Sequence, residues 1–175
     1  MYPNEADEAA RIERLHQLGI LDSPRDQLFQ SLVEQALVLV PSASIAAISI
    51  VDANRQWFKA ITGLDVRETP RSVSFCSHTI QTTGVMVVPD ATRDERFADN
   101  VLVTANPKIR SYFGVKLVSG VGALCVIGLN PQQPTEGEIE SLVKLAQYVD
   151  IQLLAFGTLH NLMTEGDGKA RRAAR

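Results

Sequence analysis

Apolar residues recur at three- and four-residue steps near the N-terminus, a spacing typical of amphipathic helices. The first such segment covers residues 4–18, where apolar positions are interspersed with charged ones. A second helix is predicted to begin at Ser23 and Pro24, because serine is a favoured N-cap and proline suits the first helical position. Its apolar stripe ends near Pro41 and requires a sheet to cover it.

The longest periodic segment lies near the other end of the chain. Thr135 followed by Glu138 forms a capping-box pattern, which predicts a helix from there to about Met163. One stripe contains Ile139, Leu142, Val143, Ala146, Val149 and Leu153, and Leu145, Tyr148, Ile151, Leu154 and Ala155 widen it. A helix that covers one sheet needs a single stripe. The surplus predicts a second partner: the N-terminal helix of the same chain, the same helix of another chain, or both. Burial entirely within its own domain is the alternative.

Between these helices, apolar runs of strand length alternate with turn signals. Strands are predicted at residues 43–51, 56–62, 86–88, 111–118 and 121–127. The first strand is apolar on both alternating faces, as expected for a central strand that is covered on both sides. Short links make the first two and the last two strands antiparallel pairs, because a parallel crossover needs a dozen residues or more.

The segment 63–110 interrupts the strands with polar loops and short helical turns. Residues 63–72 are predicted to form a loop, and Ser74 to cap a short helix that ends near Gly84. Thr92 is predicted to open a further helical turn through a capping box. This segment is therefore expected to cover a sheet face with irregular structure.

Together these elements predict an α+β fold. An antiparallel sheet of five to six strands carries the N- and C-terminal helices on one face and segment 63–110, a loop and short-helix cover, on the other. The predicted organisation is an N-terminal helix in residues 1–22, a domain in residues 23–163 that includes the long last helix, and a disordered basic tail in residues 164–175.

Six stretches of sequence, in order along the chain, carry a resemblance to a known family. They read LHQLGILDSPRDQLF, IVDANRQWFKAITGLDVRETPR, VSFCSHTI, VMVVPD, ATRDERFADN and IRSYFG. Over roughly residues 10–155 the chain resembles GAF domains, the small-molecule-sensing modules of bacterial signalling proteins. It is most similar to those that precede diguanylate cyclase or histidine kinase domains. The resemblance implies a GAF/PAS-like fold, a homodimer formed through the terminal helices and a downstream signalling protein as partner.

The cover is the predicted ligand site, because polar and aromatic groups gather there and a loop-rich layer packs less completely than a helical one. The candidate ligand-binding residues are Trp57, Phe58, Phe75, Cys76, His78, Asp90, Arg93, Arg96, Phe97, Arg110, Tyr112 and Phe113. The expected partner is a small-molecule effector, with no metal and no permanent cofactor. For each of these residues the structural alternative is that the aromatic rings belong to the core and the arginines hold loops together.

The chemistry of the short helix after Ser74 narrows the expected ligand class. Its first backbone N–H groups lack intrahelical partners, so its N-terminus favours a small anionic or amphipathic metabolite. The same position favours the thiolate of Cys76, which with Cys125 forms a candidate redox pair. The alternative is that both cysteines are small buried side chains.

Metal and chromophore chemistry are not expected. The three histidines, His16, His78 and His160, are scattered, and neither a zinc spacing nor a CxxCH haem motif is present. Some GAF domains hold bilins through a cysteine followed directly by histidine, whereas here Ser77 separates Cys76 from His78.

Cysteine-dependent catalysis is the main rival function, since a few proteins with the GAF fold reduce free methionine sulfoxide. The cysteine-bearing loop pattern of those enzymes is not recognisable in this chain. A P-loop, a GxGxxG fingerprint, a GxSxG elbow and an HExxH helix are also missing. The prediction is a non-catalytic sensory domain, with ligand-free protein–protein interaction or dimerisation as the alternative.

The last predicted hairpin departs from the family pattern. Lys116 stands where proline is usual, and Gly128 stands where an aspartate is usual. If that aspartate supports the ligand pocket, this chain binds a different ligand or is a purely structural domain.

Composition excludes several partner classes. The 175 residues suffice for one well-buried core, and 45% of them are hydrophobic. A net charge of −3 gives no reason to expect binding of nucleic acid, which usually requires a basic face, and no apolar run is long enough for a membrane span. The charged N-terminus is unlike a secretory signal, so a cytoplasmic protein with two reduced cysteines is expected.

Overall fold

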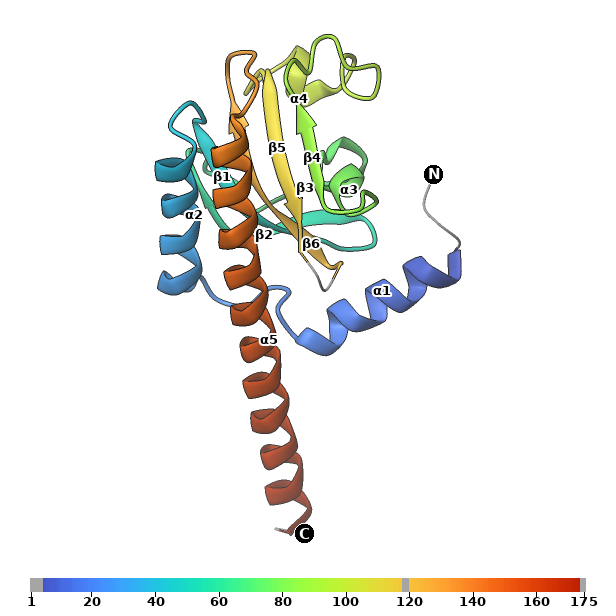
Figure 1. The fold of residues 1–175 in the computed structure, drawn as a ribbon. Coiled ribbons are helices and arrows are strands. Elements are labelled where there is room, and N and C mark those ends of the chain that lie inside the picture. Colours follow the sequence, from blue (N-terminus) through green and yellow to red (C-terminus); the bar gives the residue numbers. More distant parts are fainter. Residues whose placement is uncertain (1–4, 118–119, 174–175) are drawn as a thin grey trace.

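The computed structural model describes residues 5–117 and 120–173, with side chains as far as residue 164. Within these residues, six strands form one antiparallel sheet in the order β3-β2-β1-β6-β5-β4 (Figure 1). The strands are β1 (Ile45–Val51), β2 (Arg55–Thr62), β3 (Glu68–Pro70), β4 (Val85–Val88), β5 (Ser111–Lys116) and β6 (Gly122–Gly128). The predicted antiparallel α+β fold is confirmed. Val118, the predicted end of one strand, lies outside the described residues.

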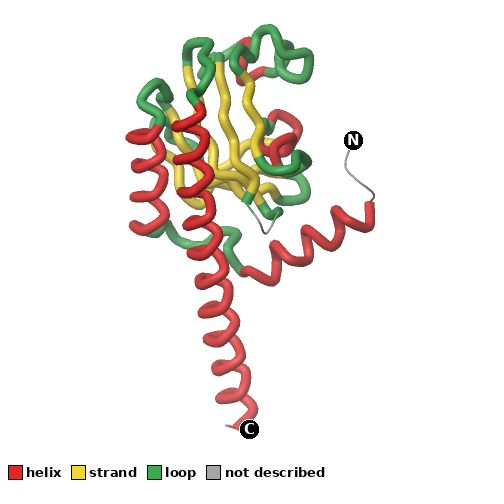
Figure 2. The backbone as a smooth tube through the Cα atoms, in the orientation of Figure 1, coloured by secondary structure: helices red, strands yellow, loops and turns green. Residues whose placement is uncertain are grey.

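Five α-helices and one 3₁₀ turn accompany the sheet in the described part of the chain. They are α1 (Glu5–Leu18), α2 (Gln27–Leu39), the 3₁₀ turn η1 (Arg71–Val73), α3 (Cys76–Thr79), α4 (Val101–Thr104) and α5 (Glu136–Ala173). Helices α2 and α5 lie side by side on one face of the sheet, while α3 and α4 belong to the opposite side (Figures 1 and 2).

The central strand β1 divides the interior into two apolar layers. Ala46, Ile48 and Ile50 pack into the layer under α2 and α5, which we call the helix-face core. Ala47 and Val51 pack into the layer under segment 63–110, which we call the cover core. Side chains alternate along a strand, so a strand buried on both faces must be apolar throughout. The predicted two-sided burial of this strand is confirmed.

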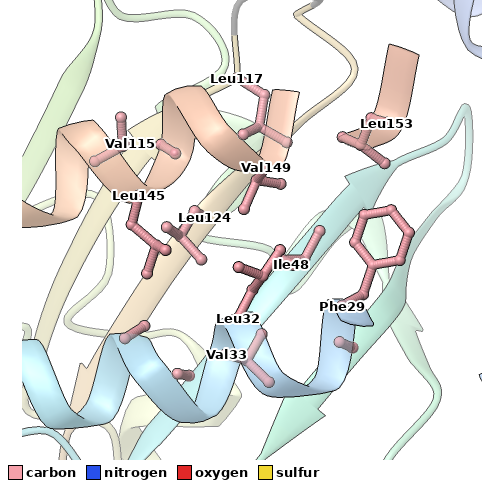
Figure 3. Close-up of a cluster of buried hydrophobic side chains, with 14 of the residues drawn as sticks. Phe29, Leu32, Val33, Ile48, Val115, Leu117, Leu124, Leu145, Val149 and Leu153 are labelled. Carbon is pink, nitrogen blue, oxygen red and sulfur yellow. The ribbon is translucent and has the colours of Figure 1, made fainter. Parts of the chain in front are cut away.

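The helix-face core is continuous from α2 across the sheet to α5. Figure 3 shows Phe29, Leu32 and Val33 of α2 facing Ile48, Val115, Leu117 and Leu124 of the sheet region and Leu145, Val149 and Leu153 of α5. Each fully buried side chain of this size stabilises the fold by roughly 1.5–3 kcal/mol relative to exposure. This packing fixes the N-terminal half of α5, whereas its C-terminal half runs past the sheet (Figure 1).

A β-bulge in β2 places a lysine in the helix layer. Ile48 pairs with Ala60 and Ser49 pairs with Phe58, so Lys59 is the extra residue of the bulged strand. The extra residue lets Phe58 face the cover while Ala60 faces the helices.

The ammonium group of Lys59 binds the residues just before the start of α2. It donates hydrogen bonds to Ser23 Oγ and to the carbonyl of Pro24, both at 2.9 Å. It also lies 5.2 Å from the ring centroid of Phe29 and 4.9 Å from that of Phe156. Burial lowers the pKa of Lys59. These contacts join β2 to α2 and α5.

The predicted start of the second helix is wrong. Asp26, rather than Ser23, is the N-cap of α2, and its carboxylate accepts a hydrogen bond of 2.8 Å from the N–H of Leu28. The Ser23 hydroxyl is used instead by Lys59 and by the carbonyl of Ile20. A tertiary contact that the local sequence does not reveal therefore moves the helix start by three residues.

Three further predictions within the cover need correction. The predicted loop at residues 63–72 contains β3 and most of η1, and α3 ends at Thr79 rather than near Gly84. The Thr92 hydroxyl donates to Asp90 Oδ1 at 2.6 Å and does not cap a helix. Asn100 caps α4, a helix that the sequence analysis missed.

The beginning of α5 matches its prediction, but its end does not. The N–H of Thr135 donates to Glu138 Oε2 at 2.7 Å, and the N–H of Glu138 donates to Thr135 Oγ1 at 3.2 Å, which is a reciprocal capping box. The predicted disordered tail is wrong for residues 164–173, which continue the helix. Residues 169–173 are lysine, alanine and arginine, which have high helix propensity, whereas Gly166 and Gly168 before them do not favour a helix. Residues 174–175 lie outside the described residues.

An ionic cluster ties α1 to the sheet and to the cover. Arg11 donates to the carbonyl of Val51 at 2.6 Å and to both carboxylate oxygens of Glu8 at 2.7 and 2.8 Å. Arg71, the first residue of η1, donates to Glu8 at 2.7 Å and to the carbonyl of Asp52 at 2.9 Å. The hydrogen bonds from Arg11 and then Arg71 lower the pKa of Glu8 from 4.5 to about 2.

We predict that Glu8 stabilises the fold above pH 4.5 and that this contribution is lost as pH falls towards 2, because its folded-state pKa is depressed. Glu8→Gln should lower the free energy of unfolding by about 1–3 kcal/mol at pH 7, since it leaves two arginines without their carboxylate. Urea denaturation at several pH values measures this effect. Glu5→Gln, an exposed change in the same helical turn, is the control; equal losses in both variants would contradict the prediction.

Candidate functional site

Aromatic rings fill much of the cover core. The rings of Phe75 and Phe97 stack with centroids 3.9 Å apart and planes 9° apart. Tyr112 of β5 lies against Phe75 at 5.3 Å, and His78 meets the edge of Phe97 at 4.8 Å. Burial, followed by the charge of Arg96, lowers the pKa of His78. Four of the predicted ligand-binding residues therefore contact one another and act as packing elements.

The N-terminus of α3 is occupied by the protein itself. Ser74 Oγ accepts a hydrogen bond of 3.1 Å from the N–H of Ser77, and the Ser74 hydroxyl donates to the side-chain carbonyl of Gln56. The helix begins at Cys76, and Ser74, Cys76 and Ser77 are all buried. The Ser77 N–H group of the predicted anion site is therefore already bonded within the protein.

Two thiols meet in the deepest part of the cover core. Cys76 of α3 and Cys125 of β6 have their sulfur atoms 3.7 Å apart, and the residues are only 2% and 1% exposed. The Tyr112 hydroxyl donates to the Cys76 sulfur at 3.3 Å and shares a hydrogen bond of 2.6 Å with the Thr79 hydroxyl. The sequence named both cysteines but could not place them together, because 48 residues separate them along the chain.

The two thiols have unequal acidities. Burial by itself raises the pKa of a thiol, but contacts with Cys125, Ser49 and Tyr112 outweigh it and lower the pKa of Cys76. The contact with Cys76, together with burial, raises the pKa of Cys125 well above its usual value. Ser49 Oγ is fully buried and makes no hydrogen bond of good geometry among the described residues. If one thiol of the pair ionises, it is Cys76.

A small apolar cavity of about 40 Å³ adjoins the thiols. Its lining consists of Ile45, Ala47, Gln56, Phe58, Ile61, Leu64, Thr69, Phe75, Cys76, Leu102, Pro107, Ile109, Tyr112, Cys125 and Ile127. Cys76, Cys125 and Tyr112 are buried at its base, while Leu64 and Pro107 are partly exposed. Pockets for metabolites usually measure about 300–1,000 Å³, so this cavity accepts a molecule near the size of water unless the cover moves.

Trp57 and Phe113, both predicted to bind ligand, lie on the wrong side of the sheet for this cavity. Their side chains belong to the helix-face core. Neighbouring residues of a strand point to opposite faces, so Phe58 and Tyr112 face the cover while Trp57 and Phe113 do not. Strict alternation of side chains along the two predicted strands would have placed Trp57 and Phe58, and likewise Tyr112 and Phe113, on opposite faces of the sheet.

The predicted polar residues of the cover hold its loops together. Arg96 pairs with Asp94 at 2.6 Å and lies 5.0 Å from the Phe97 ring. Arg93 approaches Asp90 at 3.6 Å on the surface.

Arg110 donates to the carbonyls of Val103 and Ile109 at 3.0 and 2.9 Å. Asp90, Arg93, Arg96, Phe97, His78 and Arg110 are absent from the cavity lining. Conversely, most residues that line the cavity were not predicted as site residues, among them Gln56, which begins a predicted strand, and Leu102 and Pro107, which carried no chemical signal.

The described residues contain no cluster of three or more histidine, cysteine, aspartate or glutamate side chains that could hold a metal ion. His16, His78 and His160 lie on three different helices, α1, α3 and α5. Over the same residues, no helix is both long and apolar enough to cross a membrane.

Comparison with solved structures decides the fold. A GAF domain from a Coxiella burnetii phosphoenolpyruvate-protein phosphotransferase superposes with a TM-score of 0.63 at 14% identity, covering 87% of this chain and 96% of that one. The chain folds as a GAF domain. The fold alone does not specify activity, because the type II free methionine-R-sulfoxide reductase of Thermoplasma acidophilum is also similar, with a TM-score of 0.61 at 12% identity over 74% of this chain and 92% of that one.

Sequence comparison relates this chain, which has the GAF fold, to an enzyme. It is 41% identical over 152 residues, or 84% of its length, to a cyclic di-GMP phosphodiesterase of Pseudomonas aeruginosa. The chain spans about a quarter (26%) of that relative. No family model matches the chain.

We predict that Tyr112→Phe destabilises the GAF domain by about 1–2 kcal/mol, because the buried Thr79 hydroxyl and the Cys76 sulfur lose their common partner. The shift in the urea midpoint measures the loss. Tyr148→Phe removes a hydroxyl from an exposed tyrosine and should change stability by less than about 0.5 kcal/mol. A similar loss in both variants would show that the buried hydroxyl has no special role.

Proposed function

We propose that this GAF domain is a non-catalytic, cytoplasmic sensory and relay domain that signals as a homodimer through α5. The relation to a cyclic di-GMP phosphodiesterase supports a role in regulating an enzyme of cyclic-dinucleotide turnover. The observation that carries the proposal is an exposed apolar stripe on α5.

The stripe begins on the exposed side of the half of α5 that packs on the sheet and continues along the half that runs past it (Figure 1). Its members are Tyr148, Ile151, Ala155, Leu159 and Leu162, at successive steps of three and four residues. The four larger side chains are 47–62% exposed. Apolar residues at this spacing form the seam of a coiled coil, in which each side chain packs between those of a partner helix. A second copy of α5 in parallel orientation presents the complementary seam and leaves both domains on the same side.

The other side of α5 is already occupied, so the stripe is the side available to a partner. Leu145, Val149 and Leu153 are buried in the helix-face core. Farther along, Gly157 packs so closely against Leu18 of α1 that a Cβ atom at this position would lie 2.8 Å from the leucine side chain. The intramolecular contacts thus orient the stripe away from the domain.

Helix α1 supplies a route from the cover to α5. Its N-terminal half is bonded through Glu8 to Arg71, which stands three residues before Ser74 at the entry to α3. Its C-terminal end meets α5 at Gly157, where α5 leaves the domain. A displacement of the cover would therefore reach the base of the proposed dimer seam through one helix.

Binding of a small molecule beneath segment 63–110 is a second candidate function, favoured by the apolar cavity at the base of that segment. Phe58, Phe75, Cys76 and Tyr112 are the predicted ligand residues that line it. Any metabolite must displace the partly exposed rim, including Leu102 and Pro107. Native mass spectrometry of freshly purified protein should reveal a retained adduct, and a Phe58→Trp variant, which narrows the cavity, should lose it. If no preparation shows a bound small molecule, this candidate function is contradicted.

We predict that Ile151→Glu and Leu159→Glu each weaken dimerisation at least about tenfold, because a carboxylate is costly to bury in an apolar seam. Light scattering over a concentration series measures the dissociation constant. Asn161→Glu adds the same charge to an exposed position on another side of the same helix and should leave the constant unchanged. A wild-type chain that stays monomeric at all concentrations would overturn the proposed dimer.

A further inference from the structure

The arrangement of Cys76 and Cys125 suggests a chemical role beyond packing. Their sulfur atoms lie 3.7 Å apart, whereas a disulfide requires about 2.05 Å. Closing the gap needs a shift of about 1.6 Å, which the short helix α3 can supply more readily than β6, since β6 is paired with strands on both sides. The pair is therefore near a bonding geometry without being bonded.

The surroundings of the pair favour a reaction at Cys76. The Tyr112 hydroxyl donates to its sulfur at 3.3 Å, and the buried Ser49 hydroxyl, which has no well-formed hydrogen bond among the described residues, is close enough to lower its pKa. A thiolate is the nucleophilic form of cysteine, so these donors support attack by Cys76. Cys125 is then in place as the second sulfur of the reaction.

The cavity supplies a size-selective path to the sulfurs. Both cysteines line it, and its partly exposed residues, such as Leu64 and Pro107, lead from the thiols towards the surface. Its volume of about 40 Å³ accepts a molecule comparable to one or two waters and excludes a tripeptide disulfide such as oxidised glutathione. The oxidant that fits is a small peroxide.

We propose that Cys76 and Cys125 form a peroxide-sensitive dithiol that hydrogen peroxide, entering this cavity, converts into an intramolecular disulfide. The Cys76 sulfur attacks one peroxide oxygen, the O–O bond breaks, and the departing hydroxide takes the thiol proton and leaves as water. Cys76 is now a sulfenic acid. The Cys125 sulfur attacks it, the S–O bond breaks, and the hydroxyl leaves as a second water with the Cys125 proton. Two thiols lose two electrons and two protons, and one peroxide becomes two waters.

The disulfide would also alter the proposed relay. Drawing α3 towards β6 pulls on η1, and Arg71 of η1 holds Glu8 of α1. The chemical step stands without any dimer, and only its transmission to α5 rests on the proposed function. An intracellular disulfide of this kind is expected to be reversible and regulatory.

Peroxide treatment of the reduced, folded wild-type protein tests the chemistry without any variant. Alkylation under denaturing conditions should count two free thiols per chain before treatment and none after it, and peptide mapping should recover Cys76 joined to Cys125 within one chain. Dithiothreitol should restore both thiols. Oxidised glutathione should leave the folded protein unchanged but react with the protein unfolded in urea.

Single variants test the order of the steps. Cys125→Ser should accumulate a dimedone-reactive sulfenic acid at Cys76, while Cys76→Ser should react at least about tenfold more slowly at Cys125 because the favoured thiolate is gone. Thiols that survive peroxide in the folded protein would overturn the proposal, as would disulfides found mainly between chains. Equal oxidation rates with peroxide and with oxidised glutathione would show that the thiols are oxidised after the protein unfolds, not through the cavity.

The Leu159→Glu variant separates the two proposals. It should form the disulfide at the wild-type rate even where it no longer dimerises, since Leu159 lies on the exposed part of α5, away from the thiols. If the wild-type protein forms the disulfide without any change in dimerisation, the proposed dithiol chemistry stands and the proposed relay is contradicted. If the wild-type protein does not form the disulfide, only the proposal about Cys76 and Cys125 is contradicted, and the proposed dimer is unaffected.

Discussion

Burial of the central sheet on both faces is the constraint on which the rest of this structure depends. Strand β1 is buried throughout, so each face of the sheet must be covered by a separate layer. The helix layer provides one regular surface, and the irregular segment 63–110 provides the other. The regular layer contains α5, the helix of the proposed dimer, while the irregular one contains Cys76 of the proposed dithiol.

The cover core is filled by close packing of its own rings, which explains the small cavity. Tyr112 lies directly over Gly114, where a Cβ atom would come within 2.2 Å of its hydroxyl oxygen. This space allows the Tyr112 hydroxyl to reach Cys76 and Thr79. Filling the interior with an aromatic side chain reduces the room for a metabolite but leaves the two sulfurs adjacent to a cavity of water size. This cavity therefore suits the proposed reaction of the dithiol better than the binding of a large ligand.

Sequence reasoning succeeded where the signal is local and periodic. The alternation in β1 predicted burial on both faces, and the Thr135 capping box predicted the start of α5. It failed where distant residues compete for a group: Lys59 takes the Ser23 hydroxyl that was expected to cap α2. The proximity of Cys76 and Cys125 arises from the packing of α3 on β6, and no local pattern encodes it.

The proposed switch needs one element that moves and another that resists, and the fold offers both. Strands β1, β5 and β6 are paired along most of their lengths, so the sheet resists displacement. Helix α3 has four residues and is linked to η1, whose Arg71 bonds α1. In the proposed switch, a change at Cys76 would therefore displace the cover and α1 rather than the sheet. Because α1 ends against Gly157, the displacement would reach α5 where it leaves the core, and a small rotation there would change how two copies of α5 pair in the proposed dimer.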